Sequence, residues 1–160
     1  MSIFEDTAPR AVRHEPLRVA VLGASGSVGM QTLDVCRHFP QKVQVVALAV
    51  RSSAEFAVKA ANEFNCKYVA FADASVKGNV LLDALPQGCK ASFGPEAVQV
   101  LAELDEVDCV VNAVVGEAGI YAGLAAVKAG KVLAYANKES IVVGGDLLMP
   151  LVKPGQLIPV

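Results

Sequence analysis

The sharpest chemical pattern in the sequence is a glycine-rich turn, which reads Gly23-Ala24-Ser25-Gly26-Ser27-Val28-Gly29. An apolar, β-branched run at residues 17–22 precedes the turn, and a helix-like stretch at residues 27–38 follows it. Backbone N–H groups at the start of such a helix are free to bind phosphate, and the helix dipole adds positive potential there. This strand–turn–helix context is typical of a dinucleotide-binding site, although a purely structural turn also uses glycines in this way.

The residues of the turn have separate expected roles in holding a pyrophosphate. Gly23 permits the tight turn, Gly26 lets the backbone approach the ligand, and Gly29 lets the helix pack closely on the strand. The hydroxyls of Ser25 and Ser27 are further donors toward the phosphates. The spacing is GxxGxxG rather than the common GxGxxG, so the sequence predicts a variant of the usual phosphate turn.

Arg51, Ser52 and Ser53 follow the second apolar run (43–50) and indicate which dinucleotide is bound. Folds that prefer NAD place an acidic residue about 20 residues after the turn, where it accepts a hydrogen bond from the ribose 2′-hydroxyl. Here the first acid is Glu55, which lies beyond the expected helix start. A guanidinium and two hydroxyls suit a 2′-phosphate, because Arg binds phosphate through two parallel hydrogen bonds. We therefore expect NADP rather than NAD, with an ordinary solvated arginine as the alternative.

A third cluster, Asn137, Lys138 and Glu139, lies where another expected strand ends. Open α/β sheets bind ligands at the carboxyl edge, so an amide, a cation and a carboxylate there are suited to hold a cofactor or an anionic substrate. Asn137 is equally suited to cap the next helix, and Glu139 to favour its N-terminus. The small residues of segment 112–119 leave room for a flat ring or a ribose, or simply form a tight loop.

Short apolar runs alternate with helix-length amphipathic stretches and would position these clusters. The expected strands cover residues 17–22, 43–50, 68–71, 88–93, 108–112, 131–136 and 156–160. The expected helices cover residues 27–38, 75–85, 95–104 and 119–128, and two short ones begin near residues 137 and 144. A further helix opens at Ser52-Ser53-Ala54-Glu55, which has capping-box spacing, and ends near residue 64. This alternation predicts an α/β, doubly wound fold with a mostly parallel sheet.

Composition excludes several classes of protein. The chain has 160 residues, of which 54% are hydrophobic, so it suits one domain and is too apolar for intrinsic disorder. A net charge of −2 argues against nucleic-acid binding, and no apolar run is long enough to cross a membrane. The four cysteines lack metal-ligand spacing and are expected to be buried and reduced. Residues 1–16 have the polarity of a flexible leader rather than of a secretory signal, so we expect a cytoplasmic protein with one domain over residues 17–160.

Five segments together resemble the 1-deoxy-D-xylulose 5-phosphate reductoisomerase family, and the resemblance covers residues 17–160. The segments are LGASGSVGMQTLDV (22–35), VVALAV (45–50), VVGEAGIYAGLAAVKAGK (114–131), ANKESIVVGG (136–145) and LIPV (157–160). The resemblance implies a Rossmann-like, NADPH-binding domain. The intact enzyme isomerises and reduces 1-deoxy-D-xylulose 5-phosphate to 2-C-methyl-D-erythritol 4-phosphate in non-mevalonate isoprenoid biosynthesis. For that enzyme the resemblance implies a sugar-phosphate substrate, a Mg²⁺ or Mn²⁺ ion and a homodimer.

The resemblance also implies roles for individual residues. By position, the family's cofactor contacts fall on Ser25, Gly26, Ser27 and Val28 for the pyrophosphate, on Arg51, Ser52 and Ser53 for the 2′-phosphate, and on Asn137 and Glu139. Lys138 falls where the family contacts the sugar-phosphate substrate. The family commonly has a glycine, a basic or polar residue and an asparagine where this chain has Arg-Ser-Ser, so the 2′-phosphate contacts are expected to differ in detail.

The family's metal-binding carboxylates directly follow its LIPV-like strand, which ends here at Val160. We therefore expect the metal ligands just after Val160 and none within the chain. Residues 1–160 are then expected to bind NADPH without catalysing the reaction. Two alternatives from other classes stay open at this point. One is another NADP-dependent oxidoreductase, such as a semialdehyde dehydrogenase, and the other is a non-catalytic nucleotide-sensing module.

Overall fold

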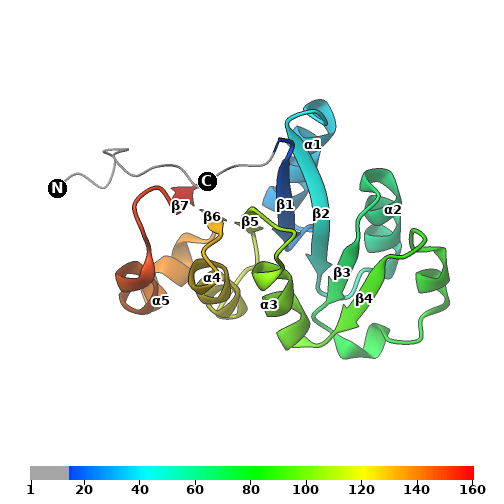
Figure 1. The fold of residues 1–160 in the computed structure, drawn as a ribbon. Helices are drawn as coiled ribbons and strands as arrows, with labels where there is room; N and C mark the ends of the chain where they lie inside the picture. The colour runs from blue at the N-terminus through cyan, green and yellow to red at the C-terminus, as the bar shows by residue number, and fades with distance from the viewer. Residues whose placement is uncertain (1–14) are drawn as a thin grey trace.

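Seven parallel strands form one sheet in the order β4-β3-β2-β1-β5-β6-β7 (Figure 1) in a computed structural model that describes residues 15–160. The strands are β1 (Leu17–Leu22), β2 (Val43–Val50), β3 (Tyr68–Phe71), β4 (Lys90–Phe93), β5 (Cys109–Asn112), β6 (Val132–Tyr135) and β7 (Leu157–Pro159). The strand order reverses at β1, as in a doubly wound fold. The predicted fold class is confirmed, and the sheet is wholly rather than mostly parallel. The leader predicted for residues 1–16 lies almost entirely outside the described residues.

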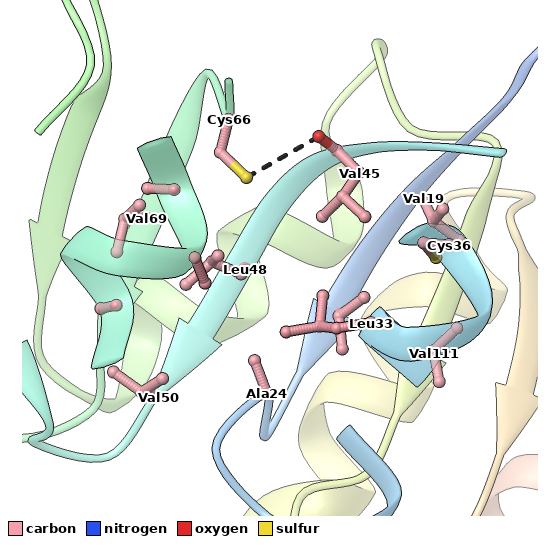
Figure 2. Packing of buried hydrophobic residues seen from close by; sticks show 14 of the residues in the cluster. Val19, Ala24, Leu33, Cys36, Val45, Leu48, Val50, Cys66, Val69 and Val111 are labelled. Atoms are coloured by element: carbon pink, nitrogen blue, oxygen red, sulfur yellow. Dashed lines mark hydrogen bonds between the residues drawn. The ribbon is translucent and has the colours of Figure 1, made fainter. Parts of the chain in front are cut away.

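Helices cover both faces of the sheet and create two apolar cores. One face is covered by α1 (Ser27–His38) and α2 (Ala54–Phe64), and the other by α3 (Pro95–Glu103), α4 (Ala118–Lys128) and α5 (Lys138–Leu148). Figure 2 shows the first core, in which Leu33 of α1 belongs to one cluster with Val19 of β1 and Val111 of β5. The strand β2 is buried from residue 45 to residue 50. Its nearly continuous apolar run is therefore explained by burial on both faces.

The single helix predicted over residues 75–85 is wrong, because the chain forms two short 3-10 helices there, η1 (Ala74–Val76) and η2 (Val80–Ala84). The side-chain oxygens of Asp73 and Asn79 each accept a hydrogen bond from the amide two residues on, at 2.9 Å. These local bonds start two separate turns. Gly78 lies between the turns at φ +87°, a conformation that favours glycine and that an α-helix cannot contain.

Two further predictions about helix boundaries are also wrong. The helix α5 runs unbroken through Gly144, where a new helix was expected, and continues into η3 (Met149–Leu151). A Cβ atom on Gly144 would lie 2.8 Å from Ile120 Cγ2 of α4, so this glycine allows two helices to pack closely. The helix α2 begins at Ala54 without a side-chain cap, so the capping box is not formed and Glu55 is one position too early to complete it.

The other expected elements are confirmed to within two residues at each end. None of the four cysteines forms a disulfide: Cys36, Cys66 and Cys109 are buried and Cys89 is half-buried. Burial raises the pKa of the Cys66 thiol to about 12, which keeps it protonated. Residues 15–160 contain no group of three side chains that could hold a metal ion. None of the helices in this part of the chain is long and apolar enough to span a membrane.

Candidate functional site

Gly23 and Gly29 are both required by the backbone of the glycine turn. Gly23 has φ +77°, and a Cβ atom on it would lie 2.6 Å from the Ala113 carbonyl oxygen. A Cβ atom on Gly29 would lie 2.2 Å from the Gly23 carbonyl oxygen. Neither position has room for a side chain. The tight turn and the close helix–strand packing expected from the glycine spacing are therefore present.

Gly26 differs from the other two glycines, because the fold does not need it. It precedes α1 in an extended conformation, and a Cβ atom there would meet only the Gly23 carbonyl oxygen, in ordinary contact at 3.4 Å. The amides of Ser27, Val28 and Gly29 have no hydrogen-bond acceptor among residues 15–160. No side chain caps this helix, and no acid lies in its first turn. These open donors and the positive helix end suit an anion such as a pyrophosphate.

The predicted 2′-phosphate group, Arg51, Ser52 and Ser53, is exposed at the carboxyl end of β2, beside the glycine turn. The two segments are held together by the Gly23 and Ala24 amides, which donate to the Ala49 carbonyl oxygen at 3.0 and 2.9 Å. The guanidinium of Arg51 makes no hydrogen bond or ion pair within residues 15–160. It is therefore available to a ligand.

Asp73 is a nearby acid that sequence reasoning missed. Its amide donates to the Arg51 carbonyl oxygen at 2.9 Å, which places it beside the predicted phosphate-binding group. Hydrogen bonds from Ser75 lower the pKa of Asp73, and the positive charge of Arg51 lowers it further, so the carboxyl is ionised. The residue follows β3 rather than β2. Only the pairing of Val50 with Phe71 in the sheet reveals that the two strand ends meet.

A cavity of about 330 Å³ opens at the carboxyl ends of β5 and β6, and three predicted segments line it together. Its walls are formed by Val28, Ala113, Val115, Ala136, Asn137, Lys138 and Glu139. The first turn of α1, the loop after β5 and the first turn of α5 thus meet at one site. Gly23, Ser25, Gly26, Ser27 and the group at residues 51–53 lie outside the lining, on the β1–β2 side.

The side chain of Asn137 is occupied by structural contacts. Its oxygen accepts a hydrogen bond from the Ser140 amide at 3.2 Å, which caps α5, and its amide nitrogen donates to the Val114 carbonyl oxygen at 2.9 Å. The capping alternative is therefore confirmed for this residue. Lys138 and Glu139 are exposed in the cavity wall, and neither side chain makes a hydrogen bond or ion pair within residues 15–160. Among the three, these two are free to receive a ligand.

Asn112 and Ser140 are buried polar residues that lie within the predicted segments but received no role of their own from the sequence. Asn112 donates to the Gly119 carbonyl oxygen at 2.7 Å and accepts from the Val114 amide at 3.3 Å. The hydroxyl of Ser140 donates to the Gly116 carbonyl oxygen at 3.0 Å. The hydrogen bonds of both side chains hold the segment that follows β5. Nothing in their local sequence distinguishes them from ordinary strand and helix residues, because their partners lie on other elements.

Val160, after which the metal ligands are expected, follows β7 at the carboxyl edge of the sheet. Its amide donates to the Tyr135 carbonyl oxygen at 3.1 Å, so it lies beside the end of β6. Its own side chain is apolar and exposed, and it offers no atom to a metal ion. The expected ligands would follow residue 160 and lie outside the described residues, so their position stays a prediction.

The sequence matches one family model over residues 19–145, that of 1-deoxy-D-xylulose 5-phosphate reductoisomerase. The protein of that name from Photorhabdus laumondii is 39% identical over 147 residues, which cover 89% of this chain and 37% of that protein. The one from Mycobacterium marinum is 40% identical over 148 residues, covering 90% of this chain and 34% of that protein. The chain thus spans little more than a third of the curated relatives it matches. These matches favour neither the semialdehyde dehydrogenase nor the nucleotide-sensing alternative.

Solved structures give the same result. The reductoisomerase from Zymomonas mobilis in complex with NADPH superposes with a TM-score of 0.83 at 36% identity, over 91% of this chain and 38% of that one. A reductoisomerase in complex with NADPH, fosmidomycin and magnesium gives a TM-score of 0.78 at 33% identity, over 89% of this chain and 35% of that one. A biliverdin reductase from Synechocystis, at 20% identity and a TM-score of 0.61, shares the fold alone.

Proposed function

We propose that this chain, which belongs to the 1-deoxy-D-xylulose 5-phosphate reductoisomerase family, binds NADPH across the carboxyl edge of its sheet. The uncapped start of α1 is the observation that carries the proposal. The amides of Ser27, Val28 and Gly29 have no acceptor among residues 15–160, and no acid of the first turn competes with a phosphate for them. NADPH, when bound, supplies the hydride for a reduction.

The pyrophosphate is assigned to the open side of the glycine turn. Gly23 and Gly29 hold the turn, and the absence of a side chain at Gly26 lets the phosphates approach the backbone. The hydroxyls of Ser25 and Ser27 and the amide of Val28 complete the donor set, as the family resemblance implies. All of these donors lie at the end of β1, where the strand order reverses.

The positions of Arg51 and of the cavity give the proposed direction of the cofactor. The strands β2 and β5 flank β1 on opposite sides. Because Arg51 follows β2, we assign the adenosine half to β2 and the nicotinamide half to β5 and β6. Arg51, with Ser52 and Ser53, binds the 2′-phosphate and selects NADPH over NADH. The nicotinamide half enters the cavity, where Glu139 is free to accept a hydrogen bond from it.

Lys138 is assigned to the substrate. Its ammonium group is exposed in the cavity wall, so it presents a positive charge to the phosphate of a sugar phosphate. Asn137 contributes to the cofactor site mainly by shaping the wall, because both ends of its side chain already have partners. Lys138 and the cofactor's nicotinamide would thus be brought to one cavity, as a reduction of the substrate requires.

For the whole protein we propose the family reaction, the conversion of 1-deoxy-D-xylulose 5-phosphate to 2-C-methyl-D-erythritol 4-phosphate, in a cytoplasmic homodimer. The described residues do not fit a Mg²⁺ or Mn²⁺ site, since residues 15–160 contain no cluster of three potential ligands. We therefore derive no step through a metal from these residues, and the ligands are proposed to follow Val160. Residues 1–160 by themselves are proposed to bind NADPH without turnover.

Titration of residues 1–160 with NADPH and with NADH, followed by the fluorescence of the reduced nicotinamide, tests the proposal. We expect NADPH to bind at least about tenfold more tightly, because the 2′-phosphate adds charge-assisted hydrogen bonds. Equal affinities would contradict the role given to Arg51. Addition of the sugar phosphate with Mg²⁺ or Mn²⁺ should leave bound NADPH unoxidised, and steady oxidation would show that the chain catalyses the reaction alone.

A further inference from the structure

The loop that follows β5, residues 113–117, is fastened through its carbonyl groups. The Gly116 carbonyl oxygen accepts from the Ser140 hydroxyl at 3.0 Å, from the Gly119 amide at 3.2 Å and from the Asn137 side chain at 3.5 Å. The Val114 carbonyl oxygen accepts from the same Asn137 nitrogen at 2.9 Å. Two side chains at the start of α5 therefore hold the loop.

The contact between the loop and α5 is close and buried. Ser140 is only 3% exposed. A Cβ atom on Gly119 would lie 2.7 Å from the Val114 carbonyl oxygen and 3.3 Å from the Ser140 hydroxyl oxygen. The glycine thus lets the start of α4 approach α5 closely enough for the hydroxyl to reach the loop.

Only the first two amides of the loop are bound within the described part of the chain, to the Leu22 carbonyl oxygen at 2.9 Å and to the Asn112 side chain at 3.3 Å. The amides of Val115, Gly116 and Glu117 make no hydrogen bond within residues 15–160. Its side chains form one part of the cavity wall, at Ala113 and Val115, and the exposed fraction of Val115 is 85%. The second half of the loop is therefore held mainly through its carbonyl groups.

We infer that Ser140 is a positioning residue for the nicotinamide half of the cofactor. Its hydroxyl holds the loop against the turn of α5 that carries Lys138 and Glu139, so the cofactor wall and the substrate-facing residues form one rigid unit. The inference rests on the proposed function, since it takes the cavity to be the nicotinamide site. It predicts that loss of the hydroxyl weakens binding at one end of the cofactor and not at the other.

The test compares Ser140→Ala with the unmodified chain by using two probes. NADPH occupies the whole site, whereas adenosine 2′,5′-bisphosphate occupies only the β1–β2 side. We expect Ser140→Ala to weaken NADPH binding about tenfold and to reduce the fluorescence gain of the bound nicotinamide, as the loss of one buried hydrogen bond allows. Binding of adenosine 2′,5′-bisphosphate should stay within about twofold of the unmodified chain.

Tyr135→Phe is the matched control. Tyr135 is buried and its phenol hydrogen-bonds with Ser140, so the variant also removes a buried hydroxyl but leaves the bond to Gly116 in place. It should bind both probes like the unmodified chain. Without any ligand, NMR order parameters of residues 114–117 should fall in Ser140→Ala from about 0.85 toward 0.6, and stay high in the control.

The possible outcomes separate the inference from the proposed function. Equal weakening of both probes in Ser140→Ala, unchanged NADPH binding, or an unchanged loop order parameter would each overturn the positioning role. If the unmodified chain binds neither probe, the proposed function itself is wrong, and the inference fails with it. A selective loss for NADPH with a loosened loop supports both.

Discussion

The two edges of the sheet differ in whether their charged side chains are paired. At the amino edge the charges satisfy one another. The guanidinium of Arg18 donates two hydrogen bonds to the Asp108 carboxylate, at 2.7 and 3.0 Å, and the Arg18 amide donates a third at 2.9 Å. Lys67 Nζ lies 2.9 Å from one oxygen of the Glu106 carboxylate, and the Tyr68 hydroxyl donates to the other. The first pair ties the starts of the neighbouring strands β1 and β5 together, and the second group ties the start of β3 to the loop after α3, so these charges serve the fold.

At the carboxyl edge the charges are left without ion pairs. The side chains of Arg51, Lys138 and Glu139 make no hydrogen bond or ion pair within residues 15–160, and the first amides of α1 are equally open. Buried polar groups such as Ser140 are fully used there, but only to shape the loop around the cavity. The binding edge is therefore marked by exposed polar groups without partners and not by the number of charges.

Gly29→Ala should have the largest effect, and it should act on stability. Gly26→Ala, in the same turn, should act on NADPH binding instead. The Gly29 variant forces a methyl group against the Gly23 carbonyl oxygen, so we expect a loss of about 3 kcal/mol in the free energy of unfolding. Gly26→Ala should unfold like the unmodified chain and bind NADPH more weakly, because its methyl group faces the phosphates. Urea unfolding and NADPH titration measure the two effects, and equal unfolding curves for the two variants would contradict the distinction.

Arg51→Gln should weaken NADPH binding about tenfold and leave NADH binding unchanged, because only the 2′-phosphate loses its partner. Arg37→Gln is the control, since Arg37 is already paired with Asp34 and Glu63 on α1 and α2. Its loss should slightly destabilise the fold without changing either affinity. If both variants lost NADPH affinity alike, the contrast between paired and unpaired arginines would fail.

Glu106→Gln tests how much the charges at the amino edge contribute to stability at different pH values. Hydrogen bonds from Tyr68 and then Lys67 lower the pKa of Glu106 from its usual 4.5, so the ionised carboxylate stabilises the fold above that pH. Its contribution is lost as the pH falls through the lowered pKa. The variant should therefore have a modestly lower urea midpoint at neutral pH, a difference that shrinks as the pH falls below 4.5, and unchanged NADPH binding. A difference that grows in acid would reverse the sign of the argument.

Asp73→Asn should have the smallest effect. Removal of an ionised carboxylate beside Arg51 should tighten NADPH binding about twofold, because repulsion of the 2′-phosphate at an exposed site is weak and screened by salt. NADH binding should not change, and high salt should abolish the difference. A weaker affinity for NADPH in this variant would mean that the carboxylate binds the cofactor rather than opposing it.

The fold was largely predictable, because apolar runs such as residues 43–50 indicate directly that a strand is buried. The errors lie where side chains override the pattern. Asp73 and Asn79 start two separate turns where one helix was expected, and Gly144 is required by its contact with Ile120 of a different helix. At the site, segment 137–139 was identified from its residue types, but the role of Ser140 depends on a loop 24 residues away in the chain. Such a partner becomes visible only once the strands are in register.

The close approach of Gly23 to the Ala113 carbonyl joins the phosphate turn to the loop that walls the cavity. Replacing the glycine turn is therefore a poor way to change the cofactor preference of this fold. An atom added at Gly23 would displace the Ala113 carbonyl and, with it, the loop that forms the cavity wall. Residues 51–53 are exposed, and the neighbour described beside them is Asp73 rather than the cavity loop. Redesign of cofactor choice is best confined to them.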